Sequence, residues 1–216
     1  MKLCTISDTH GQHSKLDLKN YPADVLVFAG DWTKGKDLAL SETQDFLLWL
    51  NDQPYEHILF IAGNHEVQVE AAPERFAHML SHYPKLTYLN NSATTIDGVK
   101  FYGSPYSNEF YNWAFMAKEL DLAPIWAAIP DDTNVLITHG PAYECLDRVN
   151  SNHNRDPHVG STYLRDRKKE LQQLKLHVFG HIHESAGSSI TTCNNVNASL
   201  LNARYQLVNT PIVVNI

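Results

Sequence analysis

The feature of this sequence that most constrains its fold is a series of short apolar runs that end in small and polar residues. Runs of four to six apolar residues bounded in this way are typical of buried β-strands. Five of the runs end in polar clusters: Ser7-Asp8-Thr9-His10, Gly30-Asp31, Gly63-Asn64-His65-Glu66, Thr138-His139-Gly140 and Gly180-His181-Ile182-His183. Because the carboxyl ends of strands in open α/β sheets share one crevice, we expect these clusters to converge in space.

The order of strands and helices predicts an α/β chain. Strands are expected at Leu3–Ser7, Val25–Ala29, His57–Ala62, Val99–Gly103, Val135–Thr138, Leu176–Phe179 and Pro211–Asn215. Helices are expected at Leu38–Leu50 and Pro73–His82, and near Trp113–Ile129 and Ser161–Gln173. The first third alternates strand and helix, which favours a parallel sheet, whereas tighter turns in the last third favour an antiparallel part. Without repeats or linkers, residues 1–216 are expected to form one domain.

Composition restricts the partners and the compartment. Lys+Arg 17 against Asp+Glu 24 gives a formal net charge of −7, which argues against binding to extended nucleic acid or to an anionic membrane. The 3 cysteines have no C-x-x-C spacing, which favours a reducing compartment. The N-terminal apolar stretch is too short for an export signal, and no run is long enough to span a bilayer. We therefore expect a cytoplasmic protein.

Two of the clusters have the spacing of metal ligands. Asp8-x-His10 and His181-x-His183 each place two donors on the same side of an extended backbone. Carboxylate, amide and imidazole donors without a thiolate suit Mn, Fe, Co, Ni or Zn, and they leave the choice among these ions open. Two ions about 3.5–4 Å apart need a carboxylate between them, and Asp31 is the natural bridge. Each motif alone is common in ordinary turns, but the combination of five predicts a metal centre.

Taken in order, the five clusters resemble the motif set of the calcineurin-like metallophosphoesterases, and the resemblance spans nearly the whole chain. It is nearest to the small branch of metallophosphoesterase-domain-containing proteins, which carry stretches similar to Gly103-Ser104-Pro105-Tyr106 and Trp113-Ala114-Phe115. The resemblance implies an α/β fold with four αββα layers, in which two mixed sheets are flanked by helices.

The resemblance also implies a dinuclear site and the roles of its residues. The first ion would be held by Asp8, His10, Asp31 and His183, and the second by Asp31, Asn64, His139 and His181. A hydroxide shared by the two ions would attack phosphorus in line. The catalytic residues would be Asp31, Asn64 and His65, of which His65 binds no metal but stabilises the transition state and can protonate the leaving oxygen.

The substrate class is predicted less directly. No arginine lies within the motifs to grip a dianionic monoester, which favours small phosphodiesters, and relatives suggest cyclic nucleotides as one class. Trp32-Thr33-Lys34-Gly35 stands where protein phosphatases carry a second Asp and an Arg, which argues against that activity. The alternatives are a phosphomonoesterase or a short-end nuclease on the same centre, and a non-catalytic binding scaffold.

Three further segments have candidate roles. Gly30–Asp37 nearly matches Gly-x₄-Gly-Lys-[Ser/Thr], but Asp37 replaces the hydroxyl that holds Mg²⁺, which argues against an NTPase. The aromatic residues Tyr106, Phe110, Tyr111, Trp113 and Phe115 could stack a flat substrate group or pack beneath a loop. The polar loop Val149–Gly160, with His153, Arg155 and His158 and next to Arg148, could add substrate contacts. An exposed edge or the aromatic segment could also support a homodimer.

Overall fold

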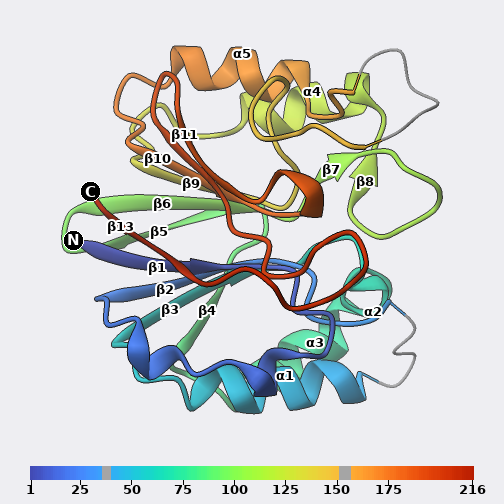
Figure 1. The fold of residues 1–216 in the computed structure, drawn as a ribbon, viewed down its shortest axis with the longest axis vertical. Coiled ribbons are helices and arrows are strands. Elements are labelled where there is room, and N and C mark those ends of the chain that lie inside the picture. The colour runs from blue at the N-terminus through green and yellow to red at the C-terminus, as the bar shows by residue number, and fades with distance from the viewer. Residues whose placement is uncertain (36–39, 151–156) are drawn as a thin grey trace.

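Two β-sheets lie face to face in the computed structural model, which describes residues 1–35, 40–150 and 157–216 (Figure 1). The five-stranded sheet has the order β13-β1-β2-β3-β4, and the six-stranded sheet has the order β11-β12-β10-β9-β6-β5. The strands of the first sheet are β1 (Lys2–Ile6), β2 (Val25–Ala29), β3 (His57–Ile61), β4 (Leu86–Tyr88) and β13 (Ile212–Asn215). Those of the second are β5 (Ser92–Ile96), β6 (Val99–Ser104), β9 (Val135–Thr138), β10 (Leu176–Phe179), β11 (Gly187–Ile190) and β12 (Asn194–Asn197).

Both sheets are mixed. Strands β1 to β4 are parallel, and β13 joins β1 in antiparallel pairing. In the second sheet β6, β9, β10 and β12 are parallel, while β5 and β11 add antiparallel edges. The parallel first third and the antiparallel elements near the C-terminus are as predicted. A further pair, β7 (Ser107–Asn108) and β8 (Met116–Ala117), forms a small separate sheet.

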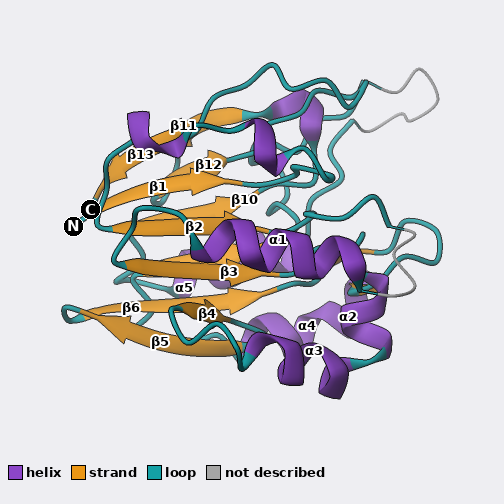
Figure 2. Ribbon diagram, turned by 90° about the horizontal axis from the view of Figure 1, so that it is seen from below, coloured by secondary structure: helices purple, strands orange, loops and turns teal. Residues whose placement is uncertain are grey.

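Helices cover the outer face of each sheet (Figures 1 and 2). The five-stranded sheet carries α1 (Ser41–Asn51), α2 (Val67–Ala71) and α3 (Pro73–Leu80), and the six-stranded sheet carries α4 (Glu119–Ala127) and α5 (Thr162–Glu170). Three short 3₁₀ turns lie at His13–Lys15, Leu18–Asn20 and His183–Ser185. The expected start of the first helix at residue 38 lies outside the described residues. The helix expected near Trp113 begins only at Glu119, because β8 occupies the preceding residues.

The alternation of side chains along the strands builds three apolar layers. In β1, Leu3 faces the inner core between the sheets, whereas Cys4 and Ile6 face the outer core beneath α1 and α3. A third core joins the six-stranded sheet to α4 and α5 through residues such as Leu136 and Trp126. Four layers of secondary structure therefore enclose these cores, and the predicted αββα fold is confirmed.

Among the described residues, no helix has the length and apolar character needed to cross a lipid bilayer.

Candidate metal centre

The five polar clusters converge where the carboxyl ends of both sheets meet. Asp8, Asp31 and Asn64 follow β1, β2 and β3 of the five-stranded sheet, while His139 and His181 follow β9 and β10 of the six-stranded sheet. The structure brings together all seven candidate ligands predicted from the sequence: Asp8, His10, Asp31, Asn64, His139, His181 and His183. The convergence of clusters that are far apart in the chain is therefore confirmed.

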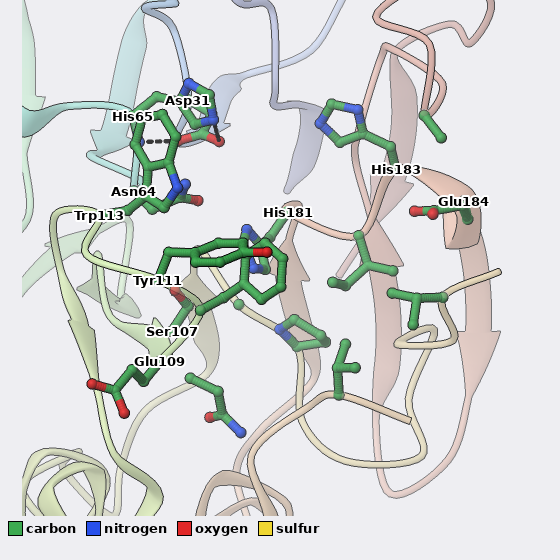
Figure 3. A pocket seen from close by; sticks show the side chains of 18 of the residues that line it. Asp31, Asn64, His65, Ser107, Glu109, Tyr111, Trp113, His181, His183 and Glu184 are labelled. Carbon is green, nitrogen blue, oxygen red and sulfur yellow. Dashed lines mark hydrogen bonds and ion pairs between the residues drawn. The ribbon is translucent and has the colours of Figure 1, made fainter. Parts of the chain in front are cut away.

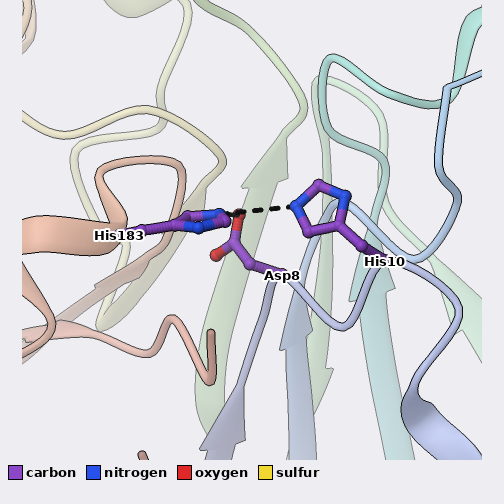
Figure 4. A group of neighbouring side chains, drawn as sticks. All are labelled: Asp8, His10 and His183. Carbon is purple, nitrogen blue, oxygen red and sulfur yellow. Dashed lines mark hydrogen bonds and ion pairs between the residues drawn. The ribbon is translucent and has the colours of Figure 1, made fainter. Parts of the chain in front are cut away.

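One half of the cluster consists of Asp8, His10 and His183, whose donor atoms all lie within 4.8 Å of one another (Figure 4). The Nε2 atom of His183 is 3.4 Å from Asp8 Oδ1 and 3.4 Å from His10 Nε2. Three possible metal-ligand atoms, from segments that follow strands of both sheets, thus face one point.

The other half is arranged around Asp31. Its Oδ2 atom lies 3.3 Å from His139 Nε2, and these two residues form a second group of possible ligands with His181. Asn64 Oδ1 is 3.0 Å from His139 Nε2. Asp31 Oδ2 is also 3.7 Å from His10 Nε2, so one carboxylate lies between the two halves.

Hydrogen bonds to backbone carbonyls fix the orientation of three of these imidazoles. Nδ1 of His10 lies 2.9 Å from Thr33 O, Nδ1 of His139 lies 2.9 Å from Ala29 O, and Nδ1 of His183 lies 3.1 Å from Asn202 O. A carbonyl only accepts, so each Nδ1 is the donor and each Nε2 faces the cluster. Buried carboxylates and imidazole Nε2 atoms that face one another fit divalent transition-metal ions once these rings lose their Nε2 protons.

The backbone at these strand ends adopts a sparsely populated conformation. Asp8, His10, Asp31 and His181 have φ values of 54°, 41°, 62° and 68°, in the left-handed region that non-glycine residues seldom occupy. Glycine at position 63 is required by a close approach, since a Cβ there would collide with the side chains of Asp31 and His139. Strain of this kind is typical of functional sites, where the surrounding structure holds it in place.

In the metal-free chain the acidic and basic groups of the cluster neutralise one another. Burial alone would raise the pKa of Asp8, but the hydrogen bond from His183 and its charge bring that pKa well below its ordinary value. Burial would lower the pKa of His139 and of His183, but Asp31 and Asp8 respectively raise each to about 9. Because metal ligands must be neutral imidazoles, binding of an ion at neutral pH releases protons from these two rings.

Buried polar groups around the cluster hold the strand ends together. Glu66, whose role the sequence left open, accepts backbone hydrogen bonds from Asp31 (2.9 Å), Thr33 (2.9 Å) and Gly63 (2.7 Å). Burial and the neighbouring Asp31 raise the pKa of Glu66 to about 8. Ser199, to which the sequence assigned no part in the site, donates to Asp8 Oδ2 at 2.7 Å.

His65 lies against the cluster and forms a third group of possible ligands with His10 and Asp31. Its Nε2 atom is 3.9 Å from Asp31 Oδ2, and its backbone N–H donates to Asp31 Oδ1 at 2.9 Å. His65 also lines the adjacent cavity (Figure 3).

A cavity of about 890 Å³ opens above the cluster, within the size range of small-molecule sites. Asp31, Asn64, His181 and His183 lie at its base. The aromatic segment divides in two: Phe110, Tyr111 and Trp113 line the cavity, whereas Phe115 and much of Tyr106 belong to the outer core. Packing beneath a loop is therefore confirmed for Phe115 and for part of Tyr106, and stacking of a substrate group by the other three residues stays a prediction.

The polar loop Val149–Gly160 is only partly described. Val149, Asn150 and Val159 line the cavity, whereas His153 and Arg155 lie outside the described residues. His158 pairs with the buried carboxylate of Asp147 at 2.6 Å.

Tyr205 was missed by sequence reasoning. Its ring lies 4.9 Å from the ring of His10 and 5.3 Å from that of His183, between centroids, and Tyr205 also lines the cavity. It stands on a polar turn in which Gln206 N donates to Asn202 Oδ1, and such a turn has no apolar periodicity to single out one residue.

The joined carboxyl ends of two mixed sheets, with a buried Asp, His and Asn cluster, are the arrangement of a metal-dependent phosphoester hydrolase. The family model "Calcineurin-like phosphoesterase" matches residues 1–185, and the chain belongs to this family. It is 36% identical to human metallophosphoesterase domain-containing protein 1, over 98% of this chain and 69% of that protein.

Solved structures show the same fold at low sequence identity. The protein TT1561 of Thermus thermophilus superposes with a TM-score of 0.68 at 12% identity, over 99% of this chain and 98% of that one. The phosphopantetheinyl hydrolase of Mycobacterium tuberculosis superposes with a TM-score of 0.60 at 17% identity, over 94% and 90% of the respective chains. The resemblance inferred from the motifs and the predicted fold are therefore confirmed.

Proposed function

We propose that the chain is a dinuclear metal-dependent phosphodiesterase that acts on small phosphodiesters. The observation that carries the proposal is the position of Asp31, whose carboxylate lies within 4 Å of Nε2 atoms from both halves of the cluster. Asp8, His10, Asp31 and His183 would hold one ion, and Asp31, Asn64, His139 and His181 the other. Two such ions, drawn from Mn, Fe, Zn, Co and Ni, supply positive charge for the phosphoryl oxygens and lower the pKa of water.

Side chains of the protein would supply the other functions of the site, which are positioning and proton transfer. Asp31 and Asn64 place their oxygens at the base of the cavity, and Glu66 keeps the backbone of Asp31 in position. His65 binds no ion in this arrangement and faces the substrate. Its imidazole would stabilise the charged transition state and give a proton to the leaving oxygen.

The lining of the cavity favours a monoanionic diester over a dianionic monoester. The described lining residues include the acidic Glu109 and Glu184 but no lysine or arginine, so a second phosphate charge would be poorly compensated. Phe110 and Tyr111 offer apolar surface to a flat ester group such as a nucleobase. A cytoplasmic location, a homodimer and the exclusion of extended nucleic acid remain predictions.

The test is manganese-dependent hydrolysis of bis(p-nitrophenyl) phosphate beside p-nitrophenyl phosphate, with Asp31→Ala as the blank. Faster turnover of the diester, absent in the variant, is the expected result. A preference for the monoester would replace the proposal with a phosphomonoesterase. If neither ester is hydrolysed, the proposed activity is overturned in favour of a binding scaffold.

A further inference from the structure

His65 is held differently from three of the four histidines of the cluster. His10, His139 and His183 each have Nδ1 hydrogen-bonded to a backbone carbonyl. The Nδ1 atom of His65 is buried and has no hydrogen-bond partner among the described residues. Hydrogen bonding therefore does not fix the rotation of this ring.

Ring contacts take the place of that hydrogen bond. The indole of Trp113 stacks on His65 with ring centroids 4.6 Å apart and an interplanar angle of 18° (Figure 3). His10 meets the same imidazole edge to face, at 4.4 Å and 73°. Two neighbouring rings thus define the position of the His65 ring.

The backbone on the C-terminal side of Trp113 is tied to the segment that carries His65. Ala114 N donates to Asn64 O at 3.2 Å, and Phe115 N donates to Glu70 Oε1 of α2 at 2.8 Å. By contrast, Phe110 and Tyr111 are 61% and 79% exposed. Trp113 is therefore anchored to the site, whereas these other aromatic residues of its loop project toward solvent.

Gly35 lies against the stacked rings of Trp113 and His65. This residue is the second glycine of the segment that resembles a phosphate-binding loop, and its φ is +83°. A Cβ at position 35 would lie 2.6 Å from the Trp113 ring and 2.9 Å from His65 Nδ1. Glycine at this position thus leaves room for the stacked pair.

We propose that Trp113 and Gly35 are positioning residues that hold the His65 imidazole against the leaving group of the substrate. The proposal rests on the proposed function, in which His65 protonates the leaving oxygen. As the bond from phosphorus to that oxygen breaks, the oxygen takes the proton of the imidazolium and departs as an alcohol. The proton that the attacking water loses restores the ring, so no further reactant is needed.

The kinetic test compares two diesters that differ only in their leaving group, methyl p-nitrophenyl phosphate and methyl phenyl phosphate. Trp113→Ala is expected to lower kcat with little change in KM, by up to about 10²-fold, the cost of misplacing a reacting group by about 1 Å. The loss should be larger for phenol, the poorer leaving group, and Trp113→Phe should restore most of kcat. Equal losses for the two diesters would contradict the proposal.

A double-mutant cycle separates positioning from direct contact with substrate. If Trp113 acts through His65, Trp113→Ala has no further effect on kcat in a His65→Ala background. Independent losses that multiply in the double variant would show that Trp113 acts on the substrate itself, and they would overturn the proposal.

Gly98 provides a matched control for Gly35. Gly98 has a similar φ of +76°, but a Cβ there would meet nothing within 4 Å. Both Gly→Ala variants therefore add backbone strain, but only Gly35→Ala should lower kcat as Trp113→Ala does. Equal kcat values in the two variants would exclude a role for Gly35. Leu120→Ala, which removes an exposed apolar side chain from α4 outside the cavity lining, should leave the ratio of the two leaving-group rates unchanged.

A spectroscopic readout keeps this proposal separate from the proposed function. In zinc-loaded protein, which is diamagnetic, the stacked indole should shift the His65 ring protons upfield in NMR spectra. Trp113→Leu should abolish that shift, and an unchanged His65 signal would overturn the proposal whatever the enzyme hydrolyses. An intact shift without diester turnover in the native protein would instead overturn the proposed function.

Discussion

The base of the cavity and its rim are built in different ways. By the base we mean the cluster beneath the cavity, Asp8, His10, Asp31, Asn64, His139, His181 and His183, of which four residues reach the cavity lining, and by the rim we mean Phe110, Tyr111, Trp113 and Tyr205. Side chains of the base follow buried strands, and three of its imidazoles are fixed by carbonyl groups. Rim side chains stand on loops and make mainly ring contacts. Under the proposed function, the base would carry the chemistry and the rim would tune it.

The largest effect is expected from removing the carboxylate shared by both halves of the base. Asp31→Ala should lower kcat/KM for the aryl diester by more than about 10³-fold, above the usual cost of deleting one electrostatic contact. The exposed Asp166→Ala on α5 serves as the control and should retain full activity. Activity of Asp31→Ala within a few fold of wild type would show that the base does not carry the reaction.

A smaller loss of metal affinity or activity is expected when the hydrogen bonds of Glu66, which support the base, are weakened. Glu66→Gln keeps the shape of the side chain but replaces one oxygen with a donor, so the three backbone N–H groups of Asp31, Thr33 and Gly63 are no longer all satisfied. Removing such supporting contacts costs about 10–100-fold in metal affinity or activity. Manganese titration and steady-state kinetics would measure the loss. The exposed Glu74→Gln on α3 should change neither quantity.

The ion pairs of the base predict that the stability of the metal-free protein, and not that of the metal-loaded protein, depends on pH. Since the folded pKa of His183 is raised to about 9 from 6.5, its contribution to stability is complete below pH 6.5 and is lost as the pH rises through 9. The free energy of unfolding in urea with a chelator present should fall over that window by about 3 kcal/mol for His183, and His139, whose pKa is likewise raised to about 9, adds to the fall. Metal-loaded protein, whose ligating imidazoles are neutral, should lack this fall. A flat profile for the metal-free protein would contradict the ion pairing of His183 with Asp8.

The smallest effect is expected at the rim. Tyr205→Ala uncovers the rings of His10 and His183 and should raise the rate of metal loss to a chelator by about tenfold, the lower end for groups that support ligands. Tyr205→Phe keeps the ring and should behave as wild type. Equal rates in all three proteins would show that the turn bearing Tyr205 does not protect the base.

The sequence predicted the base of the site far better than its rim. Candidate ligands such as Asp31 and His139 directly follow apolar strands, so they could be predicted from the point where each apolar run ends. Strand β12 was missed because three of its four residues are asparagines, which lack the apolar pattern of a buried strand. The stacking of Trp113 on His65 was not predicted, although Trp113 itself had been named as a candidate for stacking a substrate group or packing beneath a loop. Ring contacts between distant loops leave no periodic signal in the chain.

The most direct test of the account is the number and position of the metal ions in manganese-reloaded protein. Elemental analysis should give two manganese ions per chain, and anomalous diffraction should place them on either side of the Asp31 carboxylate. Asp31→Ala should lose at least one of them. Fewer than two ions in the native chain, together with unchanged binding in Asp31→Ala, would contradict the dinuclear centre.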